Sequence, residues 1–306
     1  RQGGAAPLHP LRKGGSLAKP KRRGGGAWER RAEGVRVLRL PCYKQGAFVL
    51  YWKLWSERRK PDRRGVYSLT ETTAYEYEQT IRYGYCDQRD RMRLSYLLKE
   101  VQQASMEHCD VLGIGLEYLQ PRNQAFLLAR QSARFFRAPK GGERVRVRTQ
   151  PRVCGFQYPR TTSLFAMTGE ELARVEAVWV LVDTQSRRIL RRVPEEMAGF
   201  FPPAGTAPSL RLPRLEEPDL VLECRVPLHM TDSNHHLNNA SYADLILDVL
   251  EERLLAGEAI AGLDICYHRE LKTGETFQLR RRSLERGALV DGVKDGLCHF
   301  ESQVFF

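Results

Sequence analysis

Apolar residues recur with helical spacing in two separate segments of the chain. In the first segment the positions 0, 3, 4 and 7 are occupied by Leu94, Leu97, Leu98 and Val101. In the second segment the positions 0, 3, 4, 7 and 8 are occupied by Tyr242, Leu245, Ile246, Val249 and Leu250. This spacing gathers apolar side chains into one stripe along a helix. It predicts two amphipathic helices, each of which needs another layer to cover its stripe.

Stretches with the composition of strands surround each predicted helix. One strand precedes each helix, at Ala74–Tyr83 and Leu220–Val226. Three stretches follow the first helix, AFLLARQSARFFRAPKGGERVRVRTQ, TTSLFAM and ARVEAVWVLVD, and three follow the second, IAGLDICYHRELKTGETFQLRRR, ALVDGV and LCHFESQVFF. One strand, a long helix and a run of strands make an α+β unit, in which an antiparallel sheet wraps over the helix.

The two units are copies of each other. Ser95-Tyr96 corresponds to Ser241-Tyr242 at a distance of 146 residues, and Gly142-Glu143 corresponds to Gly274-Glu275 at 132 residues. The first copy therefore carries about 14 extra residues between helix and strand, which a loop can absorb at little cost. The duplication predicts a leader, a first domain, a Pro-rich linker and a second domain, at residues 1–66, 67–193, 194–218 and 219–306.

The net charge of +12 belongs to the leader and not to the repeated body. Residues 1–66 hold 18 Lys and Arg against 4 Asp and Glu, whereas the other 240 residues hold 31 against 33. The body therefore gives no sign of nucleic-acid binding. The leader is rich in Gly and Arg and has no apolar period, so we expect it to be largely disordered. A nucleic-acid tail, an organelle transit peptide and an uninformative extension remain open for it, and we favour the last.

Membrane insertion and disulfide bonding are not expected. The apolar run Ala47–Trp55 is too short to span a bilayer and contains Lys53. The seven cysteines are scattered, with no C-x-x-C pair, which suits a reducing compartment and gives no structural zinc pattern. We expect a bacterial-type cytoplasmic location in preference to a plastid stroma.

The densest polar cluster, HMTDSNHHLNN at 229–239, lies where the second copy passes from a strand into its helix. Helix capping by Asn238 or Asn239, and an Asx-turn at Asp232, would explain one or two of these residues. Capping does not explain why acceptors, amides and imidazoles gather in one loop. The amino end of a helix can stabilise an oxygen that becomes negative, and a nearby imidazole can transfer protons.

The polar cluster and a later strand together resemble a known family. The pattern D-x-N-x-H-x-N-N, formed by Asp232, Asn234, His236, Asn238 and Asn239, is followed by Tyr267-His268-Arg269-Glu270. This combination resembles the acyl-acyl carrier protein (acyl-ACP) thioesterases of plants and bacteria, over roughly Tyr67–Phe306. The resemblance implies an α+β fold of two tandem hotdog domains and hydrolysis of fatty acyl-ACP to free fatty acid.

The resemblance also implies the roles of the site residues. The catalytic network would be Asp232, Asn234, His236 and Glu270. Glu270 would activate a water molecule or form a transient acyl link, and Asn234 with the helix-start amides at Asn238 and Asn239 would polarise the thioester carbonyl. His236 would position that carbonyl and assist proton transfer, and Asp232 would orient Asn234 or His236.

One departure from the family pattern, and a comparison of the two copies, refine the expectation. Plant members often carry Cys after the glutamate, but this chain has Leu271, and alternation puts Cys266 on the opposite strand face, so we favour a carboxylate mechanism. The first copy has Ala138 in place of Glu270, and its loop CDQRDRM lacks Asn and His. The first domain is therefore expected to be catalytically silent and to shape the acyl-chain pocket.

Several alternatives stay open at this point. His235 is out of phase with the pattern and is expected at the surface, and a metal site at His229, Asp232 and His236 is disfavoured. We expect no metal, no cofactor and no nucleic-acid partner; acyl carrier protein is the expected partner, and a homodimer is possible. One of the Arg clusters, at 187–188, 191–192 or 280–282, is a candidate for docking the acidic carrier. An acyl-CoA thioesterase and a non-catalytic acyl-binding protein are the competing functions.

Overall fold

The computed structural model describes residues 74–306, so the leader predicted at 1–66, with its Ala47–Trp55 run, lies outside the described residues. The helices and strands of the first half are β1 (Tyr75–Thr80), η1 (Tyr83–Tyr85), α2 (Leu94–Val111), α3 (Leu116–Leu119), η2 (Gln120–Arg122), β2 (Gln124–Phe135), β3 (Arg144–Pro151), β4 (Gln157–Ala166), β5 (Glu171–Asp183) and β6 (Arg188–Ile189). The second half, after η3 (Glu195–Phe200), contains β7 (Leu220–Arg225), η4 (Leu228–Met230), α4 (Tyr242–Asp248), α5 (Glu251–Ala256), β8 (Gly262–Tyr267), β9 (Thr276–Leu284), β10 (Gly287–Lys294) and β11 (Leu297–Phe305).

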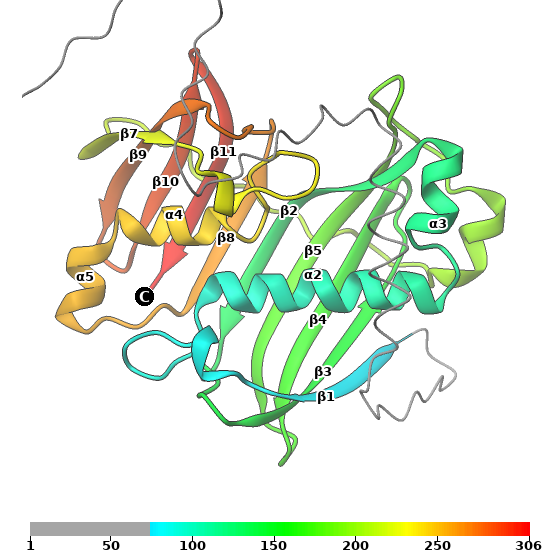
Figure 1. The fold of residues 1–306 in the computed structure, drawn as a ribbon, viewed down its shortest axis with the longest axis horizontal. Coiled ribbons are helices and arrows are strands. Elements are labelled where there is room, and N and C mark those ends of the chain that lie inside the picture. Colours follow the sequence, from blue (N-terminus) through cyan, green and yellow to red (C-terminus); the bar gives the residue numbers. More distant parts are fainter. Residues whose placement is uncertain (1–73) are drawn as a thin grey trace, which may run out of the picture. The chain divides into compact units, whose positions relative to one another are not determined.

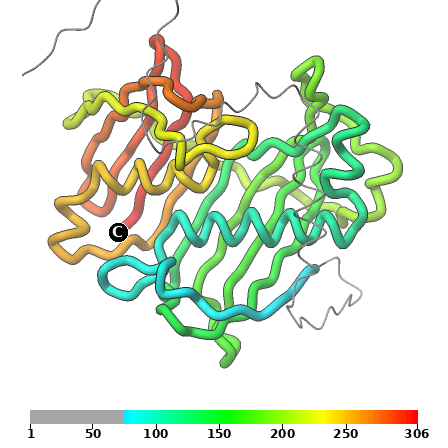
Figure 2. Tube along the Cα trace, viewed as in Figure 1, coloured from blue at the N-terminus to red at the C-terminus, as the bar shows by residue number. Residues whose placement is uncertain are grey.

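The described strands form one antiparallel sheet. Its order is β1-β3-β4-β5-β2-β8-β11-β10-β9-β7, with β6 beside β5 (Figure 1). From the outer edge inward, the first half runs β1-β3-β4-β5-β2 and the second half runs β7-β9-β10-β11-β8, which is the same order of equivalent strands. The sheet topology thus repeats the duplication seen in the sequence. In Figure 2 the tubes of the two halves, cyan to green and yellow to red, lie side by side.

The two halves join where β2 pairs with β8. The pairing runs from Arg130 opposite Cys266 to Arg134 opposite Gly262. Across this seam the Arg134 guanidinium donates to both carboxylate oxygens of the buried Asp264, at 2.6 and 2.9 Å. A paired, two-point hydrogen bond of this kind fixes geometry as well as charge, so it holds the two strands in register.

One apolar core runs through both halves under the helices. Helices α2 and α4 lie on the same face of the sheet and contact each other (Figure 1). The predicted stripe of α2 is buried at all four positions, and the second stripe is buried at all five, with Leu245 the most exposed at 8%. These side chains belong to a single cluster that also contains Val147, Leu263 and Phe300. Both predicted stripes are confirmed as core-facing.

The second helical segment differs from the first in length. Helix α2 is continuous over 18 residues, whereas the second segment is divided into α4 and α5 at Val249 and Leu250. The break frees the Val249 carbonyl, which accepts a hydrogen bond from the Arg281 guanidinium at 2.7 Å. The sequence pattern predicts one long helix here, because the apolar stripe stays buried through α4 and across the break at Val249 and Leu250. No residue of α5 is buried.

The start of the predicted linker packs onto the first half. Met197 and Phe201 are buried and share a second apolar cluster with Tyr158 and Leu181. Residues 194–218 include η3 and contain no strand, as the Pro-rich composition predicts. The domain boundaries themselves stay predictions. None of the helices in residues 74–306 is both long enough and apolar enough to span a membrane.

A polar layer lies between α2 and the sheet of the first half. The guanidinium of Arg160, only 6% exposed, donates to Nδ1 of His108 and to Oγ1 of Thr149, both at 3.2 Å. Burial and the positive charge of Arg160 lower the pKa of the His108 imidazole from its ordinary 6.5 to about 3. His108 is therefore neutral in the folded protein at pH values where the unfolded chain binds a proton.

This difference predicts how stability depends on pH. The free energy of unfolding should fall as the pH drops from about 6.5 toward about 3, because only the unfolded state protonates His108. Between pH 7 and pH 5 this single group accounts for about 2 kcal/mol. Urea unfolding of the native protein and His108→Gln at both pH values should show a weaker pH dependence in the variant. An identical pH dependence in the two proteins would contradict this explanation.

Candidate active site

Asp232 shapes the loop that carries the predicted site residues. Its Oδ1 accepts the backbone N–H of Asn234 at 2.9 Å and that of His236 at 3.3 Å, and its own N–H donates to the His236 carbonyl at 2.8 Å. His235, at the tip, has a left-handed backbone with φ of 62°. Asp232 therefore orients Asn234 and His236 through their main chain, since its carboxylate bonds their amides and not their side chains.

Glu270 reaches the loop from a segment that follows β8. His236 forms an isolated β-bridge with Lys272, and the Leu237 N–H donates to the Leu271 carbonyl at 2.7 Å. These backbone contacts bring His236 Nε2 to 3.3 Å from Glu270 Oε2. The side chains are 25% and 49% exposed respectively, so water can reach the pair. The structure thus brings together the imidazole and the carboxylate, which lie 34 positions apart in the sequence.

His299 supports the backbone of Glu270 and was not identified from the sequence. Its Nδ1 lies 3.1 Å from the Glu270 carbonyl oxygen, and its own carbonyl accepts the N–H groups of His268 and Arg269 at 2.9 and 3.1 Å. Burial lowers the pKa of the His299 imidazole. Because a carbonyl oxygen only accepts, the neutral ring carries its proton on Nδ1 and donates it to Glu270. No local sequence pattern around His299 predicts its contact with Glu270.

The three asparagines of the loop differ in the hydrogen bonds that they form. Asn234 is exposed, and within residues 74–306 its side chain makes no hydrogen bond, so its amide is free for a substrate. Asn238 Oδ1 accepts the Ala240 N–H at 2.9 Å. The Asn239 carbonyl accepts the phenol of Tyr267 at 2.9 Å. Helix α4 starts later, at Tyr242. Asn238 and Asn239 therefore hold the entry to the helix, and the Ala240 amide is already bonded.

A hydrogen-bonded chain connects this entry to the first half of the molecule. The amide of Gln131, buried on β2, donates to the Tyr267 phenol at 2.6 Å, and that phenol donates in turn to Asn239. Tyr267 also packs edge-on against Tyr242, with ring centroids 5.2 Å apart. Tyr267 belongs to the sequence pattern but Gln131 does not. Gln131 reaches Tyr267 because β2 pairs with β8, and no local spacing predicts that pairing.

The first half keeps the shape of the loop but not its chemistry. Asp87 Oδ1 accepts the N–H groups of Arg89 and Arg91 at 2.8 and 2.9 Å, as Asp232 does for its own loop, and Arg91 bridges to Lys140 as His236 bridges to Lys272. The Arg91 guanidinium folds back onto Asp87 Oδ2, at 2.9 Å. An arginine thus replaces the imidazole, and the glutamate position is Ala138.

Neither Leu271 nor Cys266 places a thiol beside the paired imidazole and carboxylate. Leu271, where plant members often carry Cys, is fully buried in the core, as is Ile265. Cys266 points to the opposite sheet face, because Ile265 and Tyr267 on either side contact the core. Burial raises the pKa of the Cys266 thiol to about 11. This arrangement gives a carboxylate, and not a thiolate, as the group beside His236.

Two family profiles match the chain. The acyl-ACP thioesterase N-terminal domain matches residues 72–201, and the acyl-ACP thioesterase C-terminal domain matches residues 216–295. The fold is that of a tandem α+β hotdog protein, and the two profiles together cover more than half of the sequence. This chain belongs to the acyl-ACP thioesterase family. The resemblance inferred from Asp232 to Glu270 is thereby confirmed at the level of the family.

Curated relatives include plant thioesterases. The chain is 25% identical over 192 residues to the chloroplastic palmitoyl-acyl carrier protein thioesterase of Cuphea hookeriana, covering 57% of this chain and 46% of that protein. It is 28% identical over 200 residues to the chloroplastic palmitoyl-acyl carrier protein thioesterase of Gossypium hirsutum, covering 60% and 48% respectively. The chain spans about half the length of the curated relatives it matches.

Solved structures confirm the fold. The 12:0-ACP thioesterase from Umbellularia californica superposes with a TM-score of 0.69 at 19% identity, covering 78% of this chain and 98% of that one. The oleoyl thioesterase (putative) from Lactobacillus plantarum gives 0.67 at 23% identity, covering 77% and 96%. The predicted α+β fold of two tandem hotdog domains is therefore confirmed.

Proposed function

We propose that this protein hydrolyses the thioester of fatty acyl-ACP and releases free fatty acid. The observation that supports the proposal most is the contact between His236 and Glu270, at 3.3 Å, in the half that matches the C-terminal domain of the family. A carboxylate and an imidazole within reach of each other, and open to water, supply the base and the proton carrier that thioester hydrolysis needs.

In the proposed reaction, Glu270 takes a proton from water as the oxygen attacks the thioester carbonyl. The carbonyl π-bond electrons move onto oxygen, and the free amide of Asn234 donates a hydrogen bond to this oxyanion. Glu270 then passes this proton to His236. When the intermediate collapses, the carbonyl re-forms, the C–S bond breaks and the imidazolium of His236 protonates the departing thiolate, so the enzyme ends as it began. The alternative, attack by Glu270 itself to form a transient acyl link, uses the same residues.

One active site per chain is proposed, in the second domain. Arg91 and Ala138 supply neither the imidazole nor the carboxylate in the first half, although its loop has the same backbone bonds. We propose that the first domain shapes the pocket for the acyl chain. The compartment also remains a proposal: the named plant relatives are chloroplastic, other relatives are bacterial, and we favour the bacterial cytoplasm.

The carrier is proposed to be acyl carrier protein and not coenzyme A. The test is to compare kcat/KM for one acyl group presented on each carrier. A preference for the carrier protein supports the proposal, and a preference for CoA would replace it with an acyl-CoA thioesterase. If neither thioester is cleaved but acyl chains bind, the non-catalytic alternative is correct. Glu252→Gln, an exposed glutamate on α5 outside the site, is the matched control for Glu270→Gln.

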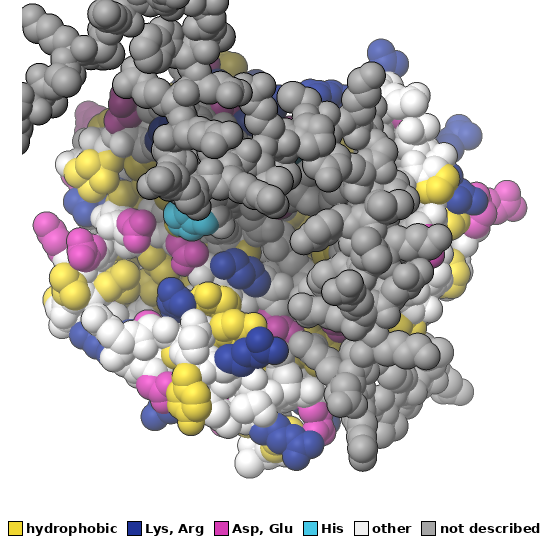
Figure 3. All heavy atoms as spheres, in the orientation of Figure 1, with side chains coloured by type: hydrophobic (Ala, Val, Ile, Leu, Met, Phe, Trp, Pro, Cys, Tyr) yellow, Lys and Arg dark blue, Asp and Glu magenta, His cyan; other side chains and the backbone are white. Residues whose placement is uncertain are grey.

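The Arg187–Arg192 group is the better candidate for contact with an acidic carrier. In the other cluster, Arg280 pairs with Asp291, and Arg281 with Asp219. The four arginines at 187, 188, 191 and 192 are exposed, and no ion pair or side-chain hydrogen bond engages them within residues 74–306. Elsewhere the visible face of the body mixes basic and acidic side chains (Figure 3), in line with its nearly balanced charge.

Reversing the charge of this group should weaken carrier recognition. With these four arginines changed to Glu, we expect KM for acyl-ACP to rise about tenfold while kcat is unchanged. Charges at the edge of an interface mainly change the rate at which the two proteins associate. The same variant should hydrolyse acyl-CoA at the native rate. Steady-state kinetics at low and high salt measure both effects, and an unchanged KM for acyl-ACP would rule out this docking surface.

A further inference from the structure

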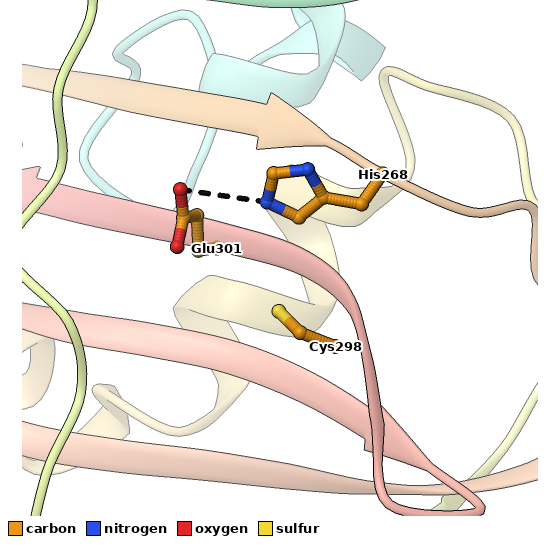
Figure 4. Close-up of side chains that lie close together, drawn as sticks. All are labelled: His268, Cys298 and Glu301. Atoms are coloured by element: carbon orange, nitrogen blue, oxygen red, sulfur yellow. Dashed lines mark ion pairs between the residues drawn. The ribbon is translucent and has the colours of Figure 1, made fainter.

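Three metal-ligating side chains gather on the sheet face turned away from α4. Tyr267 and Phe300 point toward α4, since both rings pack on Tyr242 with centroids 5.2 and 4.9 Å away. The next residues along, His268 and Glu301, therefore point the other way. Cys298, two residues before Phe300, completes the group, because the pairing of β11 with β10 shifts register between these two residues and interrupts the simple alternation. The ligand atoms of His268, Cys298 and Glu301 all lie within 4.8 Å of one another (Figure 4).

We propose that His268, Cys298 and Glu301 bind a Zn²⁺ ion, with water as the fourth ligand. This is the only group of three or more such side chains that close together in residues 74–306. It is separate from His229, Asp232 and His236, the set weighed from the sequence. Imidazole nitrogen, thiolate sulfur and carboxylate oxygen are the three donors that zinc takes in proteins, whereas Mg²⁺ and Ca²⁺ favour all-oxygen sites.

The distances suit a tetrahedral ion. Zinc bonds of about 2.0–2.3 Å place neighbouring ligand atoms about 3.3–3.6 Å apart. His268 Nε2 and Glu301 Oε1 are already 3.4 Å apart, so this pair needs no rearrangement. The Cys298 sulfur lies within 4.8 Å of the ligand atoms of His268 and Glu301, so it needs to move by at most about 1 Å. The side chains of His268 and Glu301 are 40% and 33% exposed, respectively, so an ion can enter from solvent.

Charges of both signs surround the cluster. The carboxylates of Asp291 and Glu301 lie near the Cys298 sulfur, and so do the guanidinium groups of Arg280 and Arg269. Arg280 donates to both oxygens of Asp291, at 2.8 and 2.6 Å, so Asp291 is engaged and is not counted as a ligand. On binding, the S–H proton leaves to solvent as the sulfur–zinc bond forms. The thiol then gives up its hydrogen bond to the Phe300 carbonyl.

The proposed ion would brace the backbone that carries Glu270. His268 directly follows β8, two residues before Glu270, and Cys298 lies beside His299 on β11. His299 already joins these two segments through its bonds to the backbones of His268, Arg269 and Glu270. Zinc would tie the same two segments together from the other sheet face. Its role would be structural, because its ligands are not the groups proposed to touch the substrate.

Cobalt substitution tests the site without relying on activity. The full chain, freed of metal and kept reduced, is titrated with Co²⁺ and then with Zn²⁺ in competition with a chromogenic chelator. We expect one ion per chain, a thiolate-to-cobalt absorption band that Zn²⁺ displaces, and a higher melting temperature with Zn²⁺. Absence of the thiolate band in the native protein would overturn the proposal.

Variants separate this cluster from the other cysteines of the chain. Cys298→Ser should lose the thiolate band and His268→Gln should weaken binding at least about tenfold, as expected when a first ligand is lost. Cys266→Ser is the matched control, because Cys266 lies opposite Glu301 on the neighbouring strand but outside the group, and it should keep the band. A band that persists in Cys298→Ser contradicts the assignment. His268→Gln, on an exposed side chain, keeps the test decisive if Cys298→Ser fails to fold.

Discussion

Glu270→Gln is expected to lower kcat for acyl-ACP hydrolysis by about 1,000-fold, with KM little changed. Glutamine keeps the size and most hydrogen bonds of glutamate but cannot accept a proton, and loss of general-base catalysis costs about 100- to 10,000-fold. The side chain is half exposed and its backbone is held by His299, so the variant should fold normally. Single-turnover rates with purified acyl-ACP measure the effect.

The internal repeat supplies a stringent control for this prediction. Ala138→Glu places a carboxylate at the equivalent position of the first half, but Arg91 stands there in place of His236. The double variant Glu270→Gln with Ala138→Glu should therefore stay as slow as Glu270→Gln. Restored activity in the double variant would show that a carboxylate suffices without the imidazole, and native-like activity of Glu270→Gln alone would remove the carboxylate from the mechanism.

His236→Ala is expected to lower kcat by about 100-fold, less than the loss at Glu270. Without the imidazole the departing thiolate leaves unprotonated, which a thiolate tolerates better than an alkoxide would, and proton transfer then falls to water. Single-turnover rates with purified acyl-ACP measure the loss.

The neighbouring histidine provides the matched control. His235 is exposed and takes part in the loop through its backbone, with φ of 62°. His235→Asn preserves that conformation, because asparagine tolerates a left-handed backbone. It should hydrolyse acyl-ACP at nearly the native rate. Equal losses in His235→Asn and His236→Ala would mean that the loop, and not the imidazole of His236, is what matters.

The sequence predicted those features that depend on spacing within one segment. The two apolar stripes, the strands after each helix and the Asp232-to-Asn239 loop each occupy a continuous stretch, so periodicity and residue type suffice. Glu270 was found because the family pattern includes a second segment. The division of the second helix was missed, since the apolar stripe continues through Val249 and Leu250, where the helix breaks. The Val249 carbonyl freed there binds Arg281, which is far away in sequence.

Contacts between strands that are distant in sequence could not be predicted. Gln131 reaches Tyr267 only because β2 and β8 pair at the seam, and His299 reaches Glu270 only because β8 and β11 are neighbours. Sequence spacing carries no information about such pairing. The role of Asp232 was similarly underdetermined: its residue type suits catalysis and an Asx-turn equally, and only its bonds to the amides of Asn234 and His236 identify it as a loop-forming residue.

The central claim is that the second domain hydrolyses acyl-ACP with Glu270 as the general base. It is tested most directly by incubating the purified full chain with a fatty acyl-ACP and measuring the released fatty acid and the free carrier thiol together. The account predicts equal amounts of both products with the native protein and with Glu252→Gln, and release slowed about 1,000-fold with Glu270→Gln. Release at the native rate from Glu270→Gln, or none from the native protein, would contradict it.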